Sequence, residues 1–340
     1  MKTILVTGGL GYIGSHVVVE LLQNGFKVLA IDDLSNSKEQ VLYGIHSITG
    51  QTPIFEKIDM KDKKSLVDLF TRHKNIDGVI HFAASKAVGE SVREPLKYYE
   101  NNIHSLVHLL QQMSILKIQN LIFSSSCTVY GQADKLPISE EAHIKEPKSP
   151  YGNTKKISEE IIRDTCETNH SLNAIALRYF NPIGAHESSH IGELPIGIPQ
   201  NLVPFVMQTG IGLRDKLSVY GNDYQTPDGT CIRDYIHVVD LAKAHVTAMQ
   251  RLLKNENSNS YEVYNVGTGK GTSVLEVINA FQEVSGVKLR YYFDERRPGD
   301  IESAYADTTK ANRVLGWKSR LTLKDALTSA WAWEIKLSKN

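Results

Sequence analysis

Cysteine is scarce in this sequence, and so are long hydrophobic runs and any surplus of charge of one sign. The three cysteines, Cys127, Cys166 and Cys231, lie far apart in a spacing that fits neither a disulfide framework nor a zinc site. Basic and acidic residues each number 38, which argues against nucleic acid or an anionic membrane as the main partner. No apolar run has the length of a membrane span, and the N-terminal apolar stretch is too short for a signal peptide. We expect a cytoplasmic protein without a metal site.

Short apolar segments alternate with amphipathic ones through the first half of the chain. The apolar segments are rich in β-branched or aromatic residues and end on a polar or small residue, as buried parallel strands do. They cover residues 2–8, 27–32, 53–59, 78–84, 120–126 and 173–181. Helical segments between parallel strands require right-handed crossovers. The sequence therefore predicts an α/β fold with a doubly wound parallel sheet of the Rossmann type.

The pattern becomes less regular after residue 180. Residues 181–201 are rich in Pro, Gly, Ser and His and predict a long loop, which in compact proteins is usually functional. Further helices and strands are predicted beyond it, including a strand at 262–267 that we assign to a C-terminal lobe. We expect a Rossmann domain at residues 1–181, to which segments around 230–250 return. Residues 182–340 would mainly form a smaller mixed α/β lobe.

A glycine-rich turn lies between the first predicted strand and the first helix. The stretch TGGLGYIG at residues 7–14 satisfies both Gly-x-Gly-x-x-Gly and Gly-x-x-Gly-x-x-Gly. Glycines let the backbone approach a pyrophosphate at the positive end of the helix. Asp32 ends the next strand, where a carboxylate accepts bonds from ribose hydroxyls and repels a 2′-phosphate. A purely structural turn is the alternative, but this context favours dinucleotide binding, with NAD preferred over NADP.

The stretch SPYGNTKK at residues 149–156 places Tyr151 four residues before Lys155, after a Ser-Pro pair typical of a helix start. One helical turn separates their Cβ atoms by about 5 to 6 Å. At an effective dielectric constant of about 20, the ammonium would lower the pKa of the phenol by about two units. Tyr151 could then act as a base. The alternative is an ordinary pair on a half-exposed helix surface.

Several stretches together resemble one family. TGGLGYIG, FSSSCTVYG and YGNTK resemble the extended short-chain dehydrogenase/reductase superfamily. Nearly the whole chain is then similar to the UDP-glucose 4-epimerase family within it, through IHFAASKAVGES, PLKYYENN, LRYFNPIGAH, GIPQNLVPF, VYGNDYQTPDGTCIRDYIHVVDLA, YNVGTG and RRPGD. The resemblance implies a tightly held NAD, a C-terminal lobe for a UDP-hexose, and a homodimer formed by the helices around 95–117 and 151–168. Simple packing of these helices on the sheet is the alternative.

The resemblance also implies a reaction and three catalytic residues. The family interconverts UDP-galactose and UDP-glucose by oxidising C4 to a 4-keto intermediate, which rotates and is reduced again. A base near neutrality is needed for the proton of the 4-hydroxyl group. Tyr151 would be this base, Lys155 would lower its pKa and bond the nicotinamide ribose, and Ser126 would relay the proton, with weaker support from Thr128. The positive nicotinamide ring would lower the pKa further.

Binding residues follow from the same resemblance. The cofactor residues would be Gly8, Gly11, Tyr12, Ile13, Gly14, Asp32, Asp33, Leu34, Ser35, Asn36, Ser37, Asp59, Met60, Phe82, Ala83, Ala84, Lys86, Asn101, Ser126, Tyr151, Lys155 and Phe180. The substrate residues would be Asn181, Asn201, Leu202, Ser218, Val219, Tyr220, Arg233, Arg297, Asp300 and Ala304. The two arginines would meet the phosphates as charge-assisted donors. His81, His186 and His190 are assigned no catalytic or metal-binding role.

One position bears on substrate choice. Relatives in this family carry either a bulky tyrosine or a small residue at the position of Ala304, and a small side chain leaves room beside C2 of the sugar. The sequence therefore predicts that UDP-GlcNAc and UDP-GalNAc are also interconverted.

Two other functions stay open. A nucleotide-sugar 4,6-dehydratase would need an acid and a base at Cys127 and Thr128, and an NAD-sensing protein would not need Ser126, Tyr151 and Lys155.

Overall fold

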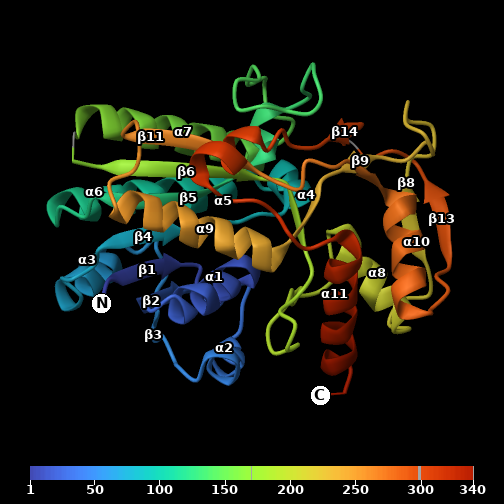
Figure 1. Cartoon of the computed structure of the whole chain (residues 1–340), viewed down its shortest axis with the longest axis horizontal. Coiled ribbons are helices and arrows are strands. Elements are labelled where there is room, and N and C mark those ends of the chain that lie inside the picture. The colour runs from blue at the N-terminus through green and yellow to red at the C-terminus, as the bar shows by residue number, and fades with distance from the viewer. Residues whose placement is uncertain (170, 298–299, 340) are drawn as a thin grey trace.

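A seven-stranded parallel sheet forms the centre of the molecule (Figure 1). The computed structural model describes residues 1–169, 171–297 and 300–339. The strand order is β11-β6-β5-β4-β1-β2-β3, so the chain reverses direction across the sheet between β1 and β4. Ligands of doubly wound sheets bind at this switch point, beyond the carboxyl ends of the strands. The strands are β1 (Thr3–Thr7), β2 (Lys27–Asp32), β3 (Ile54–Lys57), β4 (Gly78–His81), β5 (Asn120–Ser126), β6 (Asn173–Tyr179) and β11 (Tyr261–Val266).

Helices cover both faces of this sheet because successive strand residues point to opposite sides. Ile4 and Val6 face a core shared with α1 (Tyr12–Gln23), α2 (Val41–Thr49) and α9 (Val238–Leu253). Leu5, between them, faces the opposite core, which it shares with α3 (Lys63–Arg72), α6 (Ser105–Ile115) and α7 (Pro150–Thr168). Figure 1 shows α1 and α9 side by side on one face. The predicted fold class is confirmed.

Shorter helical elements lead into α6 and α7. Helices α4 (Val88–Arg93) and α5 (Pro95–Tyr99) are followed by a π-helical turn at Glu100–His104 that continues into α6, and a short 3₁₀ turn at Cys127–Tyr130 follows β5. Ser149 caps α7 by accepting a hydrogen bond from the Gly152 amide, and Pro150 takes the first helical position. The predicted helix start at this Ser-Pro pair is therefore confirmed, since serine and proline favour these two positions.

A smaller lobe lies beside the sheet, at the right of Figure 1. Its core joins α8 (Leu202–Gly210), α10 (Val274–Ser285) and α11 (Leu323–Leu337) to β8 (Leu217–Tyr220), which pairs in parallel with β13 (Tyr291–Asp294). Two more small sheets link the lobe to the main sheet. The first consists of β12 (Thr272–Ser273), β9 (Ile232–Arg233) and β14 (Ser303–Ala304). The second pairs β10 (Tyr235–His237) with β7 (Asn181–Ile183).

Three features of the second half differ from the sequence prediction. Residues 181–183, at the start of the segment predicted to be a long loop, form β7 and pair with β10. The strand expected at 262–267 is β11, which pairs with β6 along its whole length and belongs to the main sheet rather than to the lobe. Its Val263 and Tyr264 carry the apolar surface that a sheet strand buries. Helix α11 was not predicted at all. No helix in the described ranges is both long enough and apolar enough to span a membrane.

Candidate active site

The glycine-rich turn connects β1 to α1 at the switch point of the sheet. Gly8 adopts a φ of +65°, and a Cβ there would lie 2.9 Å from the Ala83 amide nitrogen. A Cβ on Gly14 would collide with the Gly8 carbonyl oxygen. Gly11 is the N-cap of α1 and has no side chain that could accept a hydrogen bond from the first amides of the helix. These amides are therefore free to bind a ligand. A close backbone surface with free amides fits the pyrophosphate of a dinucleotide.

The carboxylate of Asp32 is held at the end of β2 by three donors. Its oxygens accept hydrogen bonds from the Leu34 amide at 3.0 Å and the Ser37 hydroxyl at 2.7 Å, and from the Leu10 amide at 3.1 Å. Leu34 adopts a φ of 63°, which is uncommon for leucine. A carboxylate has about four acceptor positions, so Asp32 keeps capacity for a ribose hydroxyl.

The other predicted cofactor residues lie near one edge of the sheet, because the strands run parallel. They follow the carboxyl ends of β1 to β6, which meet at one edge of the sheet. Thr7 joins β1 to β4 there by accepting hydrogen bonds from the Phe82 and Ala83 amides, each at 3.2 Å. Asn101 comes from the π-helical turn and donates to the Ser85 hydroxyl at 3.0 Å. Asp33, Ser35, Asp59 and Met60 follow the ends of β2 and β3.

Ser126, Tyr151 and Lys155 come together where β5 ends beneath the start of α7. The Lys155 ammonium donates to the Ser124 carbonyl at 2.7 Å and lies 6.0 Å from the centre of the Tyr151 ring. The Ser126 hydroxyl oxygen accepts hydrogen bonds from Thr128, at 3.2 Å from the amide and 3.0 Å from the hydroxyl. The three side chains are buried. One strand, β5, and one helix, α7, thus supply a hydroxyl group, a phenol and an ammonium in a buried site.

Burial, rather than Lys155, dominates the pKa of Tyr151. Desolvation raises this pKa well above its ordinary value, Tyr179 raises it further, and Ser126 acts in the opposite direction. Lys155 itself has its pKa lowered to about 8 by burial, although Glu159 partly opposes the change. The expectation that Lys155 gives Tyr151 a low pKa in the protein alone is therefore wrong. The sequence spacing captured the proximity of the two groups but not the cost of desolvating a phenolate.

Four of the predicted nucleotide-binding residues form a chain of contacts in the lobe, namely Tyr220, Arg297, Asp300 and Arg233. Arg297 donates to Asp300 at 2.9 Å, and its guanidinium lies 4.9 Å from the centre of the Tyr220 ring. Arg233 lies 3.9 Å from the same aspartate and pairs across β9 and β14 with Ala304. Ser218 donates to the Tyr292 hydroxyl at 2.7 Å. Pro298 and Gly299 of the RRPGD stretch lie outside the described residues.

Ala304 belongs to a buried cluster that links this region to the main sheet. The cluster contains Phe180, which follows β6, and Val129 from the turn after β5. Asn181 continues from Phe180, and its amide donates to the Asp234 carbonyl at 2.9 Å. The structure therefore brings the predicted hexose-side residues next to the end of β5, where Ser126 lies.

Three residues of this region were missed from the sequence. Glu193 accepts hydrogen bonds from Asn201 at 3.1 Å and from Lys86 at 3.4 Å. The Tyr179 hydroxyl pairs with Ser124 at 2.9 Å, next to the contact of Lys155. Tyr235 is buried in the lobe, and burial raises its pKa to about 12, although Arg233 and Arg297 oppose the shift. None of the three lies in a spacing pattern that points to a site.

The histidines and a separate hollow lie outside this constellation. His81 pairs through Nδ1 with Thr7 at 2.8 Å, and burial lowers its pKa to about 3. Within the described ranges, no three His, Cys, Asp or Glu side chains form a group that could hold a metal ion.

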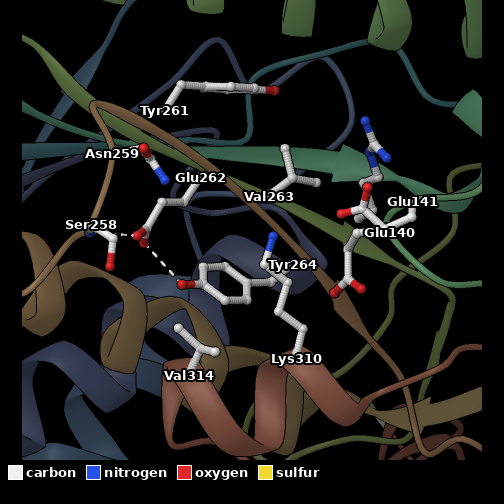
Figure 2. A pocket seen from close by; sticks show the side chains of 11 residues that line it. Glu140, Glu141, Ser258, Asn259, Tyr261, Glu262, Val263, Tyr264, Lys310 and Val314 are labelled. Carbon is white, nitrogen blue, oxygen red and sulfur yellow. Dashed lines mark hydrogen bonds between the residues drawn. The ribbon is translucent and has the colours of Figure 1, made fainter.

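A hollow of about 370 Å³ opens along β11, where the Tyr264 hydroxyl donates a hydrogen bond to Glu262 (Figure 2). It is lined by Glu140, Glu141 and Lys310 among others, and by none of the predicted site residues.

Comparisons with known proteins agree with the geometry. A family sequence model described as GDP-mannose 4,6 dehydratase matches residues 5–330. The chain is 47% identical over 339 residues to UDP-glucose 4-epimerase 1 of Oryza sativa subsp. japonica, which covers 99% of this chain and 95% of the relative.

Two solved structures are similar throughout. UDP-glucose-4-epimerase from Stenotrophomonas maltophila, with bound NAD and formylated UDP-arabinopyranose, has a TM-score of 0.96 and 45% identity, covering 100% of this chain and 99% of that one. UDP-glucose 4-epimerase from Bifidobacterium longum, in complex with NAD+ and UDP, has a TM-score of 0.95 and 46% identity, covering 98% of each chain.

Proposed function

The chain belongs to the nucleotide-sugar enzyme family that the matched sequence model represents and, within it, to the UDP-glucose 4-epimerases, and on that premise we propose that it interconverts UDP-galactose and UDP-glucose with NAD. One observation carries the proposal. Tyr151, Lys155 and Ser126 meet at the end of β5, on the sheet edge that also carries the glycine-rich turn. This places acid–base groups beside a dinucleotide cradle, as an epimerisation through a 4-keto sugar requires.

The residues at the sheet edge fit NAD. The turn around Gly8 and Gly14 leaves no room for side chains, and α1 offers free amides for a pyrophosphate. Asp32, with acceptor capacity left, would hold a ribose. When bound, NAD supplies a reversible hydride acceptor and a positive charge at its nicotinamide. We assign the remaining cofactor residues predicted from the sequence to the same groove.

Tyr151 is proposed to take the proton of the sugar 4-hydroxyl group and to return it. Burial keeps the phenol protonated in the protein alone, so the proton-accepting form requires positive charge in the site. Lys155 provides part of this charge 6.0 Å from the ring, held in place by the Ser124 carbonyl. Ser126, oriented by Thr128, is placed to bond the same oxygen. Because the site is buried, water competes poorly for the proton.

The lobe is proposed to hold UDP firmly and the hexose loosely. Arg233 and Arg297 converge on Asp300, and in this proposal their guanidinium groups bond the diphosphate as charge-assisted donors. The hexose would lie near Asn181 and Ala304, where a 4-keto sugar has to present both faces in turn. The other predicted substrate residues, Asn201, Leu202, Ser218, Val219 and Tyr220, surround the nucleotide in this proposal.

The small side chain of Ala304 supports a second pair of substrates. Ala304 is buried beside Phe180 at the hexose end of the site. A tyrosine in this place would fill the space that an N-acetyl group at C2 needs. We therefore include the interconversion of UDP-GlcNAc and UDP-GalNAc in the proposed function.

A 4,6-dehydratase, whose name the family model carries, does not fit the residues after β5. That reaction needs an acid and a base to eliminate water, and the two positions hold Cys127 and Thr128. Burial raises the pKa of the Cys127 thiol to about 12, so it is no proton donor or acceptor near neutrality. A purely NAD-sensing role leaves the buried Ser126, Tyr151 and Lys155 constellation without a purpose.

Assembly and organisation are part of the proposal. Leu96 is exposed on α5, which packs against α7, and this supports a homodimer through the helices around 95–117 and 151–168. We assign residues 1–181 and the returning segments α9 and β11 to NAD, and most of 182–340 to UDP-hexose. Because the free Cys166 and Cys231 are buried and unpaired with each other, a reducing, cytoplasmic location is proposed.

A direct assay tests the proposal. Purified protein is incubated with UDP-galactose, and separately with UDP-GalNAc, without added reductant, and the products are separated by chromatography. We expect steady formation of UDP-glucose and UDP-GlcNAc. A 4-keto-6-deoxy product would identify a dehydratase, and no conversion of UDP-galactose would refute the proposed activity. Conversion of UDP-galactose without conversion of UDP-GalNAc would refute only the second substrate pair.

A further inference from the structure

Glu193 lies between the two halves of the site. It belongs to the long loop that leads from β7 to α8, and its side chain is 14% exposed. One carboxylate oxygen accepts a hydrogen bond from Asn201 at 3.1 Å, just before α8, and a longer one from Lys86 at 3.4 Å, just after β4. A substrate-side residue and a cofactor-side residue therefore share one acceptor.

The backbone of this loop is anchored without help from the Glu193 side chain. Trp333 of α11 donates its indole N–H to the Glu193 carbonyl at 2.8 Å, and a Cβ on Gly192 would lie 2.5 Å from the same indole. Tyr12 of the glycine-rich turn donates to the Gly184 carbonyl at 2.6 Å. In Figure 1 the loop before α8 runs beside α11. A change at the Glu193 side chain should therefore leave the loop in place.

The Glu193 carboxylate lies beside Asn201 and Lys86, which are assigned to the nucleotide sugar and to NAD, both of them anionic. An isolated carboxylate would repel both ligands. Its bond to the uncharged amide of Asn201 is shorter than its contact with Lys86, which is half exposed and contributes little as an ion pair. The carboxylate therefore acts mainly as a fixed acceptor that orients the Asn201 amide.

We propose that Glu193 is a positioning residue that orients Asn201 for the nucleotide sugar and ties it to Lys86 on the cofactor side. The inference rests on the proposed function, because it gives Asn201 a ligand to meet. Glu193 touches neither ligand in this account. It sets the geometry of nucleotide binding and not the chemical step.

Three variants test this assignment. Glu193→Ala removes the acceptor, Glu193→Gln keeps an acceptor oxygen without the charge, and Glu187→Gln is the control, since Glu187 is an exposed acid of the same loop. The Kd of UDP is measured by calorimetry on NAD-loaded protein, with KM and kcat for UDP-galactose. Loss of one hydrogen bond should raise Kd and KM roughly tenfold in Glu193→Ala. kcat should stay within about threefold, and Glu193→Gln and Glu187→Gln should stay within about twofold of wild type in Kd.

A double-mutant cycle with Asn201→Ala gives the decisive readout. If Glu193 acts through Asn201, removing both side chains should weaken UDP binding no more than Asn201→Ala alone. Additive effects, an unchanged Kd in Glu193→Ala, or equal losses in the Ala and Gln variants would overturn the proposal. Glu193→Met, which keeps the side-chain length, replaces the Ala variant if that variant is unstable. A wild type that binds UDP but converts no UDP-galactose would instead refute the proposed function.

Discussion

The proposed cofactor half and the proposed substrate half of the site are built in different ways. At the sheet edge, binding groups are backbone amides and a carboxylate that is 8% exposed and already holds three donors. In the lobe they are long side chains, such as Arg297, which is 50% exposed and stacked on Tyr220. The first half is fixed before any ligand arrives, and the second half has side chains that can rearrange.

This difference suits the proposed chemistry. A cofactor that is used and regenerated in every turnover benefits from a rigid cradle, since little entropy is lost when it binds. A sugar that has to present both faces needs a site whose grip is concentrated on the nucleotide. The supporting sheets follow the same division, with seven strands under the cofactor half and strands of two residues at β9, β12 and β14.

The largest expected effect is at the junction of the two halves. Tyr151→Phe removes the proton acceptor and should lower kcat by about a thousandfold, within the range of general acid–base catalysis. Binding of UDP should be unchanged, because the residues of the lobe are not altered. Stopped assays of UDP-galactose conversion measure kcat, and calorimetry measures UDP binding. A variant with more than a tenth of wild-type kcat would remove Tyr151 from the proposed role.

A change in the turn should damage the cofactor half alone. Gly14→Ala places a Cβ against the Gly8 carbonyl oxygen, and strain of this kind typically costs 1 to 3 kcal/mol. We expect NAD binding to weaken by up to about a hundredfold, measured by the NAD that remains after gel filtration, while the Kd of UDP changes little. Gly89→Ala, whose Cβ meets only the Arg93 side chain at 3.9 Å, is the control. Equal NAD retention in both variants would contradict the assignment.

The reverse experiment targets the lobe. Arg297→Ala should raise the Kd of UDP by roughly thirtyfold, as expected for the loss of a charge-assisted hydrogen bond, and leave NAD retention intact. Arg296→Ala is a matched control, because the neighbouring Arg296 pairs with Asp223 and stacks on Tyr224 instead. If both arginine variants bind UDP equally well, Arg297 does not meet the phosphates.

The smallest expected effect concerns the titration of Tyr151. Burial holds the pKa of this phenol well above its ordinary value in the protein alone, so the neutral form persists to high pH. Positive charge from bound NAD should lower this pKa by at least about one unit. The ultraviolet difference between wild type and Tyr151→Phe, recorded against pH with and without NAD, measures the shift. Identical titrations would show that the cofactor does not activate Tyr151.

Local patterns made the cofactor half predictable. β-branched strands, the glycine-rich turn, Asp32 and the Ser149 cap all act within a few residues of sequence, and their spacing reflects the geometry they form. Burial was harder to predict, because the desolvation of Tyr151 depends on elements packed around it from distant parts of the chain. The predicted low pKa failed for this reason.

The substrate half could be predicted only through family resemblance. Glu193 meets Lys86 across 107 positions of sequence, and no periodicity marks such a contact. Helix α11 was missed although Thr322 and Asp325 form a capping box at its start, which is a readable signal. β11 was misassigned because a short apolar segment does not reveal which sheet it joins.

The late position of β11 and α9 has a consequence for synthesis on the ribosome. After residue 181 has been made, β6 is still an unpaired edge strand. The core around Ile4 and Val6 is also still exposed where α9 later covers it. The nascent chain has to keep this surface protected until residue 266 has left the exit tunnel. An expression fragment that stops at residue 181 should therefore aggregate, whereas an interruption in a surface loop after β11 would spare the sheet.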